Sequence, residues 1–222
     1  KELSAKLHLP KEKFTIIPNG IDTDFFDNLK PNPVLRESLG IKQTDTVIIC
    51  VANLYINKGH KYLLEAFEEV FRQYPNTHLI LAGEGPEREN ITSQIDSYTS
   101  KSNIHLLGRR SDIPELLKIS HIFALPTFYE GMSNAIQEAM ASSLAIISTD
   151  ISENKDLLTK GIDSLLVPAK DSEALKKALL ELLENETLLN TLGNASHATI
   201  LESFSIQKTV LQWKEIKKKN IY

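Results

Sequence analysis

Short apolar runs recur along the chain and alternate with longer amphipathic stretches. Seven runs rich in β-branched or large apolar residues are typical of strands: 14–18, 46–52, 78–83, 103–108, 121–126, 144–149 and 164–168. Most are apolar at every position rather than at every second one, which is the pattern of strands covered on both faces. We therefore expect buried strands rather than half-exposed ones.

The stretches between these runs place apolar residues at helical spacing. Helices are predicted over 60–74, 86–100, 112–120 and 133–143. Strands that alternate with helices form right-handed βαβ units, and such units build an open parallel sheet with helices on both faces. The expected fold is therefore α/β and Rossmann-like.

From Asp171 onward the pattern is helical, without strands. Asp171 is the expected N-cap of a helix whose apolar stripe consists of Leu175, Ala178, Leu179, Leu182 and Leu183. A second helix is predicted over 187–202. A third begins after Ser205, with an expected buried face of Val210, Trp213 and Ile216. The whole chain, 1–222, is thus expected to be one α/β domain with a helical tail.

Composition narrows the classes of protein and partner. The 222 residues are 41% hydrophobic and 24% charged, which is enough apolar material for a sizeable core. The net charge of −4 gives no reason to expect nucleic acid or an anionic membrane as a partner. No apolar stretch is long enough to cross a bilayer. The chain begins with lysine rather than methionine, so a preceding segment and any targeting signal stay open.

Cysteine and histidine content argues against a metal site. Cys50 is the only cysteine, which excludes an intrachain disulfide and a multi-cysteine zinc site. It lies within the apolar run 46–52, so we expect a buried core residue rather than a reactive thiol. The six histidines are scattered, with no pair at metal-ligand spacing on one predicted helix.

Ligands bind an open parallel sheet beyond the carboxyl ends of its strands, so the loops there are the places to search. Gly83 opens the loop "GEGPER", a tight turn that would let the backbone approach a ligand. This loop begins like a dinucleotide fingerprint, but its third glycine position is Arg88. An NAD-dependent enzyme therefore ranks last. Pro86 is expected at the first helical position.

The loop "NLYINKGH" (53–60) follows the strand predicted over 46–52. Lys58 and Gly59 immediately precede a helix that is expected to begin near His60. The lysine could reach an anion at the strand ends while Gly59 permits the turn. A lone loop lysine is more often simply solvated, and the spacing alone does not decide between these readings.

The stretch "TFYEGMSNAIQEAM" (127–140) follows another strand. Ser133 is the expected N-cap of its helix, and the unpartnered first NH groups of a helix suit a phosphate. Glu138 lies away from the apolar stripe of Ile136, Ala139 and Met140. It is either a solvated surface residue or a hydrogen-bond acceptor for neutral hydroxyls such as those of ribose.

Together these segments resemble the family 4 glycosyltransferases, retaining enzymes of the GT-B fold, and specifically their C-terminal, donor-nucleotide-binding domain. The resemblance runs through 16–26, 51–67, 79–88, 104–117, 124–150 and 161–175, which is nearly the whole chain. The family hallmark is an E-x7-E motif, here Glu130 to Glu138. Nothing in the chain resembles the family's N-terminal domain. Residues 1–13 resemble the connection from it, and 205–222 the helix that packs back on it.

The resemblance implies a role for each loop. Glu130 would contact the donor sugar near its reacting end, Glu138 would bind the ribose hydroxyls, and Lys58 would neutralise the diphosphate. The backbone of one turn would hold the diphosphate, and a second turn would lie against the nucleobase; their residues are Gly131, Met132, Ser133 and Asn134 for the first, and Arg109 and Arg110 for the second. Asn53 stands where the family often has an arginine, and it can donate hydrogen bonds but carries no charge.

The implied function is transfer of a sugar, with retention, from a UDP- or GDP-linked sugar to an acceptor hydroxyl in polysaccharide or glycoconjugate synthesis. No cofactor and no metal is expected. A sugar or lipid-linked acceptor would bind through the missing domain, so the fragment alone is expected to be inactive. The implied location is the cytoplasm, with peripheral association at the inner face of the membrane left open. Two alternatives stay open: a GT-B-fold sugar-nucleotide epimerase or phosphorylase, and a non-catalytic nucleotide-binding module.

Overall fold

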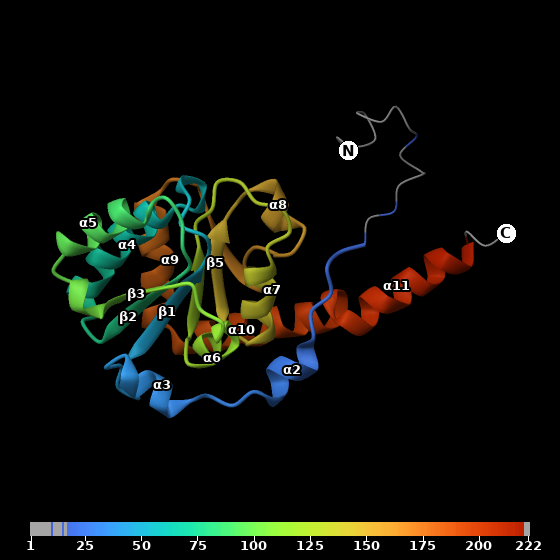
Figure 1. The fold of residues 1–222 in the computed structure, drawn as a ribbon, viewed down its shortest axis with the longest axis horizontal. Helices are drawn as coiled ribbons and strands as arrows, with labels where there is room; N and C mark the ends of the chain where they lie inside the picture. Colours follow the sequence, from blue (N-terminus) through green and yellow to red (C-terminus); the bar gives the residue numbers. More distant parts are fainter. Residues whose placement is uncertain (1–9, 11–14, 16, 220–222) are drawn as a thin grey trace.

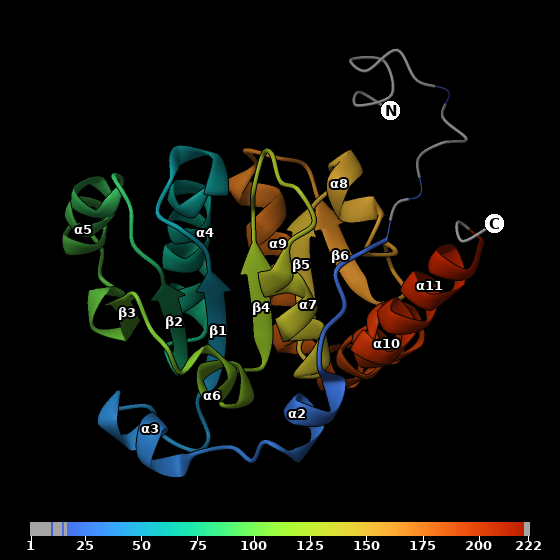
Figure 2. The same ribbon diagram turned by 45° about the vertical axis from the view of Figure 1, so that its right-hand side comes forward.

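A six-stranded, all-parallel sheet forms the centre of the molecule (Figures 1 and 2). The computed structural model describes residues 10, 15 and 17–219. The strand order is β3-β2-β1-β4-β5-β6. Their bounds are Thr46–Val51 (β1), Thr77–Ala82 (β2), Ile104–Gly108 (β3), Ile122–Leu125 (β4), Ala145–Thr149 (β5) and Ser164–Val167 (β6). Every residue of β2, β4 and β5 is buried, as expected of strands covered on both faces.

Helices cover both faces of the sheet (Figure 2). One face carries α4 (His60–Gln73), α5 (Arg88–Asp96) and α9 (Ser172–Glu184), and the other carries α6 (Ile113–Lys118), α7 (Asn134–Ala141) and α10 (Glu186–Phe204). Shorter elements complete the body: α2 (Thr23–Asn28), α3 (Pro33–Ser38), α8 (Ser152–Lys155) and the 3₁₀ turns η2 (Ile56–Lys58) and η3 (Lys101–Asn103). The α/β, Rossmann-like prediction is confirmed.

Most of the predicted elements are confirmed with small shifts at their ends. Each strand expected from 46–52 onward is present to within one residue at either end. The helix expected over 86–100 is shorter, because Pro86 and Glu87 form a turn and α5 begins at Arg88. Pro86 is therefore not the first helical residue. Asp171 caps α9 as predicted, its Oδ1 accepting from the Ala174 NH at 2.8 Å. The short helices α2, α3 and α8 were not predicted.

The predicted strand 14–18 is wrong for the part that can be described. Residues 14 and 16 lie outside the described residues, and residues 15, 17 and 18 belong to no strand. Further along, Ile21 forms only an isolated bridge with Ser205. The apolar residues of this run serve a different purpose, since Ile17 and Pro18 pack against helices and line a cavity instead of pairing with the sheet.

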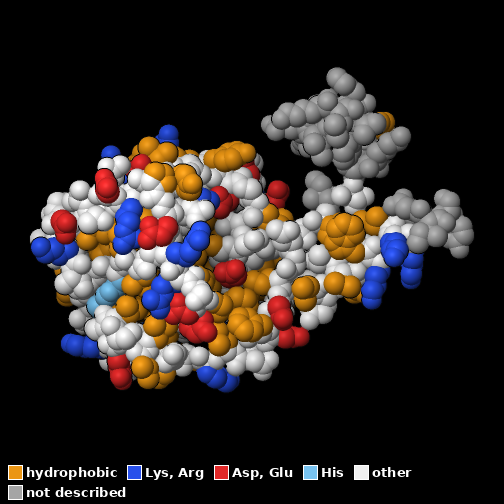
Figure 3. Space-filling view, in the orientation of Figure 1, with side chains coloured by type: hydrophobic (Ala, Val, Ile, Leu, Met, Phe, Trp, Pro, Cys, Tyr) orange, Lys and Arg blue, Asp and Glu red, His pale blue; other side chains and the backbone are white. Residues whose placement is uncertain are grey.

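The final helix, α11 (Ile206–Lys219), continues past α10 and projects from the body (Figure 1). Two residues of its expected buried face are exposed, Val210 at 43% and Trp213 at 60%, whereas Ile216 is half-buried. Hydrophobic side chains lie along this projecting helix (Figure 3). The expectation that 205–222 packs on another domain stays a prediction. Of the expected connection 1–13, all but residue 10 lies outside the described residues.

Strand order reverses between β1 and β4, which lie side by side. The chain winds outward from β1 through β2 to β3, and then returns to the other side of β1. Loops after β1 and β4 therefore leave the sheet in diverging directions, and the crevice between them is where such folds bind ligands.

Three hydrogen bonds tie these two loops together. The carbonyl of Asn57 accepts from the Phe128 NH at 2.8 Å and from the Thr127 hydroxyl at 3.1 Å. In return the Asn57 side-chain amide donates to the Tyr129 carbonyl at 3.2 Å. Thr127 is fully buried. Asn57 thus holds the loop after β4 against the loop after β1.

Gly59 is required at this contact. Its φ of 74° lies in the left-handed region, and a Cβ on it would lie 2.1 Å from the Pro126 carbonyl oxygen. Only glycine adopts this conformation without strain and leaves room for the neighbouring backbone. The turn also lets α4 begin at His60, as the sequence predicts.

Histidines cluster at the opposite, amino-terminal edge of the sheet. His78 Nδ1 lies 3.1 Å from His105 Nε2, and their rings are stacked. His78 Nε2 lies 3.2 Å from Asp45 Oδ2. Burial lowers the pKa of His105 to about 4, with the neighbouring His78 adding to the effect, and burial also lowers the pKa of His78. Both imidazoles are therefore neutral near pH 7.

The expectation for Cys50 is confirmed. Cys50 is fully buried, and burial raises the pKa of its thiol to about 12, as expected of a core residue. Among the described residues, no group of three or more histidine, cysteine or acidic side chains is arranged to hold a metal ion. Within the same residues, every helix is too short or too polar to span a membrane.

We predict that acid destabilises the fold from pH 6.5 down to about pH 4. In this window the unfolded state takes up protons on His78 and His105 while the folded state resists them, so stability falls as the pH falls. One unit of pKa difference corresponds to about 1.4 kcal/mol. Urea unfolding at a series of pH values gives the free energy of unfolding as a function of pH. Between pH 6.5 and about pH 4 this free energy should change less steeply with pH for His105→Gln than for the wild type. Equal slopes would refute this account.

We also predict that Gly59→Ala is far more damaging than Gly40→Ala. Both glycines have a left-handed φ, 74° and 69°, but a Cβ on Gly40 would meet no atom within 4 Å. Gly40→Ala should therefore cost only the conformational strain of about 1–2 kcal/mol. Gly59→Ala should add roughly 1–3 kcal/mol of overpacking, measured as the free energy of unfolding. Equal costs would show that the loops do not depend on this close approach.

Candidate functional site

An ion pair joins the two loops at the switch point. The ammonium of Lys58, from η2, contacts the carboxylate of Glu130, from the loop after β4. Their side chains are only 18% and 12% exposed. Lys58 is therefore not a freely solvated loop lysine. The structure brings together the two residues that the resemblance assigns to the reacting end of a donor.

α7 begins four residues beyond Glu130. Ser133 is the N-cap, as predicted, and its Oγ accepts from the Ile136 NH at 3.4 Å. Gly131 is exposed and Met132 half-buried, so the turn ahead of the helix borders solvent. The remaining first-turn NH groups and the positive end of the helix dipole make this turn suitable for an anion.

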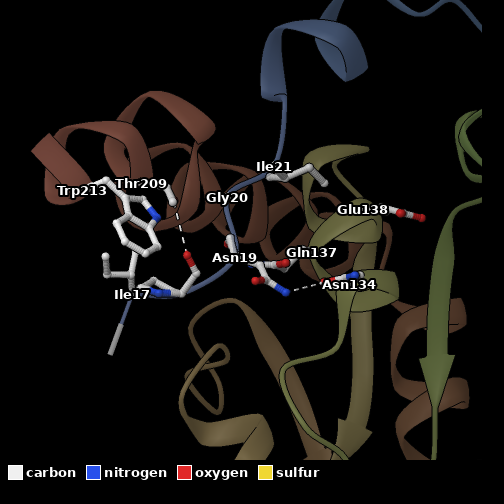
Figure 4. A pocket seen from close by; sticks show the side chains of 10 residues that line it. Ile17, Asn19, Gly20, Ile21, Asn134, Gln137, Glu138, Thr209 and Trp213 are labelled. Atoms are coloured by element: carbon white, nitrogen blue, oxygen red, sulfur yellow. Dashed lines mark hydrogen bonds between the residues drawn. The ribbon is translucent and has the colours of Figure 1, made fainter. Parts of the chain in front are cut away.

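Glu138 lies one turn further along α7, away from the core face. It is one of the residues around a cavity of about 410 Å³, together with Asn134, segment 17–21, Thr209 and Trp213, and its carboxylate points away from that segment (Figure 4). Partial burial raises the pKa of its carboxyl group. Glu138 is therefore not a fully solvated helix residue. A partly desolvated carboxylate at a cavity wall is suited to accept hydrogen bonds from neutral hydroxyl groups.

A second cavity, of about 180 Å³, is lined by the remaining residues that the sequence predicts for the nucleotide site. Asn53, Gly83, Arg109 and Arg110 all line it, from the loops after β1, β2 and β3. Gly83 packs tightly here, since a Cβ on it would lie 1.9 Å from the Ala52 carbonyl oxygen. The predicted turn at Gly83 therefore brings the loop after β2 against the loop after β1.

Arg110 is paired with Asp112, and both arginines border the cavity near Asn53. Arg110 donates to Asp112 from Nε at 2.7 Å and from Nη2 at 2.6 Å, and this pairing lowers the pKa of the Asp112 carboxyl group. Both Arg109 and Arg110 line the cavity that also contains Asn53. Positive charge is thus present beside the uncharged Asn53, at the position where the resemblance would often place an arginine.

Three residues that shape this region were not singled out from the sequence. Asn57 ties the loops, while Asn19 and Gln137 join α7 to segment 17–21 through the Gln137 amide, which donates to the Asn19 carbonyl at 2.9 Å. Loop asparagines are common, and nothing in the local pattern marks Asn57. Gln137 shares its helix face with the polar Asn134 as well as with Met140 and Ala141, so the pattern gives no signal for it either.

Comparison with known proteins is consistent with this arrangement. The model of the family described as "Glycosyl transferases group 1" matches residues 32–199. The UDP-Gal:alpha-D-GlcNAc-diphosphoundecaprenol alpha-1,3-galactosyltransferase of Escherichia coli is 29% identical over 221 residues, which are 97% of this chain and 57% of the relative. The alpha-monoglucosyldiacylglycerol synthase of Acholeplasma laidlawii is 30% identical over 200 residues, 84% of this chain and 48% of the relative.

Solved structures share the fold. Anabaena HepE in complex with UDP superimposes with a TM-score of 0.87 at 21% identity, covering 97% of this chain and 60% of the other. A glycosyltransferase from Rickettsia africae also gives 0.87, at 23% identity, covering 98% and 60%. The chain spans about half the length of the curated relatives described above. Because the family model matches well over half of the chain, the chain belongs to the group 1 glycosyl transferases.

Proposed function

We propose that the chain is the donor-binding domain of a retaining glycosyltransferase that transfers a sugar from a nucleotide-diphosphate sugar to an acceptor hydroxyl. The observation that carries this proposal is the pairing of Lys58 with Glu130 at the switch point, just before the start of α7. A cation and a carboxylate stand there beside a helix N-terminus. This set suits a substrate with a diphosphate at one end and a sugar at the other.

Catalysis would depend on stabilising the leaving diphosphate. When the bond from the anomeric carbon to the phosphate oxygen breaks, its electron pair stays on that oxygen. The acceptor oxygen forms the new bond to the anomeric carbon, and its proton passes to the leaving phosphate oxygen. Lys58 and the first NH groups of α7 would stabilise the developing charge. In the structure the counter-ion of Lys58 is Glu130. A diphosphate would compete for the ammonium and leave the Glu130 carboxylate to hydrogen-bond the sugar.

The remaining residues would bind the nucleoside part. Glu138, partly buried, would accept hydrogen bonds from the ribose hydroxyls. The nucleobase would lie in the cavity bordered by Gly83, Arg109 and Arg110, with Asn53 as a hydrogen-bond donor and the arginines as the source of positive charge. We propose that no cofactor and no metal is needed, because Lys58 and the helix start would offset the diphosphate charge.

The names and bound ligands of the similar proteins support a nucleotide-sugar donor. The Escherichia coli relative is named for UDP-Gal and a diphosphoundecaprenol-linked acceptor. Anabaena HepE was crystallised with UDP and with UDP-glucose. We propose a UDP-linked or GDP-linked donor and a role in polysaccharide or glycoconjugate synthesis. The acceptor, a sugar or a lipid-linked sugar, would bind to a part of the enzyme outside this chain, in the cytoplasm or at the inner face of the membrane.

A panel of nucleotides tests the donor proposal directly. Thermal unfolding of the chain would be followed with UDP, GDP and ADP and with their sugar conjugates. A ligand that binds only the folded state raises the midpoint, and at one hundred times its Kd it adds about 2.7 kcal/mol of stability. We expect UDP or GDP to raise the midpoint. If no compound in the panel does so, the donor-binding function is wrong.

Two variants should separate the binding of the ribose from the binding of the diphosphate. Glu138→Ala should weaken UDP and uridine alike, by roughly 1.5–3 kcal/mol, because it removes charge-assisted hydrogen bonds to the ribose. That loss is on the order of tenfold to a hundredfold in Kd. Lys58→Ala should weaken UDP strongly and uridine little. Calorimetry measures both, with GDP and guanosine as the pair if the panel favours guanine.

Glu181→Ala, at an exposed position on α9, serves as the control for loss of a helical carboxylate. It should change neither affinity. Unchanged binding in Glu138→Ala would remove the ribose assignment. Equal losses of nucleotide and nucleoside in Lys58→Ala would argue against a phosphate role.

A further inference from the structure

Segment 17–21 is held between two helical elements that are distant in sequence (Figure 4). It has no helix or strand structure beyond the isolated bridge at Ile21. On one side lies the start of α7, which contains the proposed diphosphate and ribose contacts. On the other side lies the junction where α10 ends and α11 begins. The segment therefore contacts both the proposed donor site and the base of the projecting helix.

The junction holds the segment through backbone contacts. The Ile21 NH donates to the Phe204 carbonyl at 2.9 Å, and the Ile206 NH donates to the Ile21 carbonyl at 2.8 Å. Gly20 packs so closely that a Cβ on it would lie 2.6 Å from Thr209 Oγ1 and 2.9 Å from Ile206 Cα. A displacement of the segment must therefore also displace the base of α11.

On the other side, α7 holds the segment through side-chain amides. Gln137 Nε2 donates to the Asn19 carbonyl at 2.9 Å, and Asn19 Nδ2 donates to Asn134 Oδ1 at 3.2 Å. The Gln137 amide also lies 3.8 Å from the sulfur of Met132, in the proposed diphosphate turn. The side-chain amide of Gln137 thus contacts both segment 17–21 and the turn that contains Met132.

Gln137 is placed as a buried polar side chain among core residues. It is 2% exposed, and its helix neighbours Ile136, Ala139 and Met140 are fully buried. An amide in such a place is costly unless it is hydrogen-bonded, whereas an apolar side chain would pack there without that cost. The specific contribution of the amide is its bond to Asn19.

We propose that Gln137 is a positioning residue that couples nucleotide binding at α7 to the order of segment 17–21 and the base of α11. The inference rests on the proposed function and adds a mechanical link to it. A nucleotide that restrains the turn at Met132 and the start of α7 also restrains the amides of Gln137 and Asn134. Through these hydrogen bonds it lowers the frequency with which segment 17–21 detaches and opens the backbone bonds at Ile21.

Hydrogen exchange of the chain, with and without UDP, tests this link. In the wild type, UDP should slow exchange both in α7 and at the amides of Ile21 and Ile206. In Gln137→Met, which keeps the side-chain length but has no donor, UDP should still slow exchange in α7. Its effect on Ile21 and Ile206 should be lost, and Ile21 should exchange on the order of tenfold faster, as the loss of one hydrogen bond allows.

Gln94→Met is the matched control, because the Gln94 amide also donates to a backbone carbonyl, that of Lys61, at 3.2 Å, but on α5. It should leave the response of Ile21 unchanged. If Gln137→Met does not fold, Gln137→Leu takes its place, since it also removes the donor to the Asn19 carbonyl. Segment protection by UDP that persists in the folded variant refutes the coupling.

Two further outcomes separate the proposals. If UDP slows exchange in α7 of the wild type without affecting Ile21, nucleotide binding stands and the coupling is wrong. If no nucleotide of the panel slows exchange in α7, the proposed function fails and the coupling fails with it. Loss of nucleotide affinity itself in Gln137→Met would also contradict a positioning role, because it would make Gln137 a binding residue.

Discussion

The close approach of two loops at the reversal of strand order underlies the rest of the site. The backbone after β1 passes so near the backbone after β4 that only a glycine fits at Gly59, and Asn57 fastens the contact with hydrogen bonds in both directions. Because both loops start from parallel strands whose central residues are buried in the core, neither can shift without disturbing the core. This contact is what brings Lys58 within reach of Glu130, although 72 positions separate them in the sequence.

The ion pair that results has consequences for chemistry. Two opposite charges in a crevice that is mostly shielded from water attract each other more strongly than a surface pair does. Each charge also compensates for part of the hydration that the other loses on burial. The positive end of α7 begins close by in the chain, so an incoming anion would find a cation and unpartnered NH groups near one another. An acid that is already beside the lysine is then available for the neutral part of the ligand. Charge complementarity, rather than a single strong binding group, would define the orientation of the donor.

The same helix start also connects the site to the edge of the domain. α7 presents Asn134 and Gln137 to segment 17–21, while Glu138, the next residue, lies at the cavity wall. Side chains three and four positions apart share a face of a helix, and adjacent ones diverge, so one short helix can serve core, cavity and segment at once. Exposed apolar side chains of α11, Ile206 and Trp213 among them, lie where this segment meets the helix. The site and the projecting helix are therefore parts of one connected structure.

Much of this could be predicted from residues alone. Continuous apolar runs indicated buried parallel strands, and Ser133 and Asp171 indicated where their helices begin, because these features depend on local hydrogen bonding and on burial that the pattern records directly. The run 14–18 misled the prediction, since apolar character does not distinguish a strand from a segment packed against helices. The order of the strands, the Lys58–Glu130 contact and the roles of Asn57 and Gln137 were decided only by the tertiary structure. Each depends on which distant segments become neighbours, and a single sequence pattern contains no record of that.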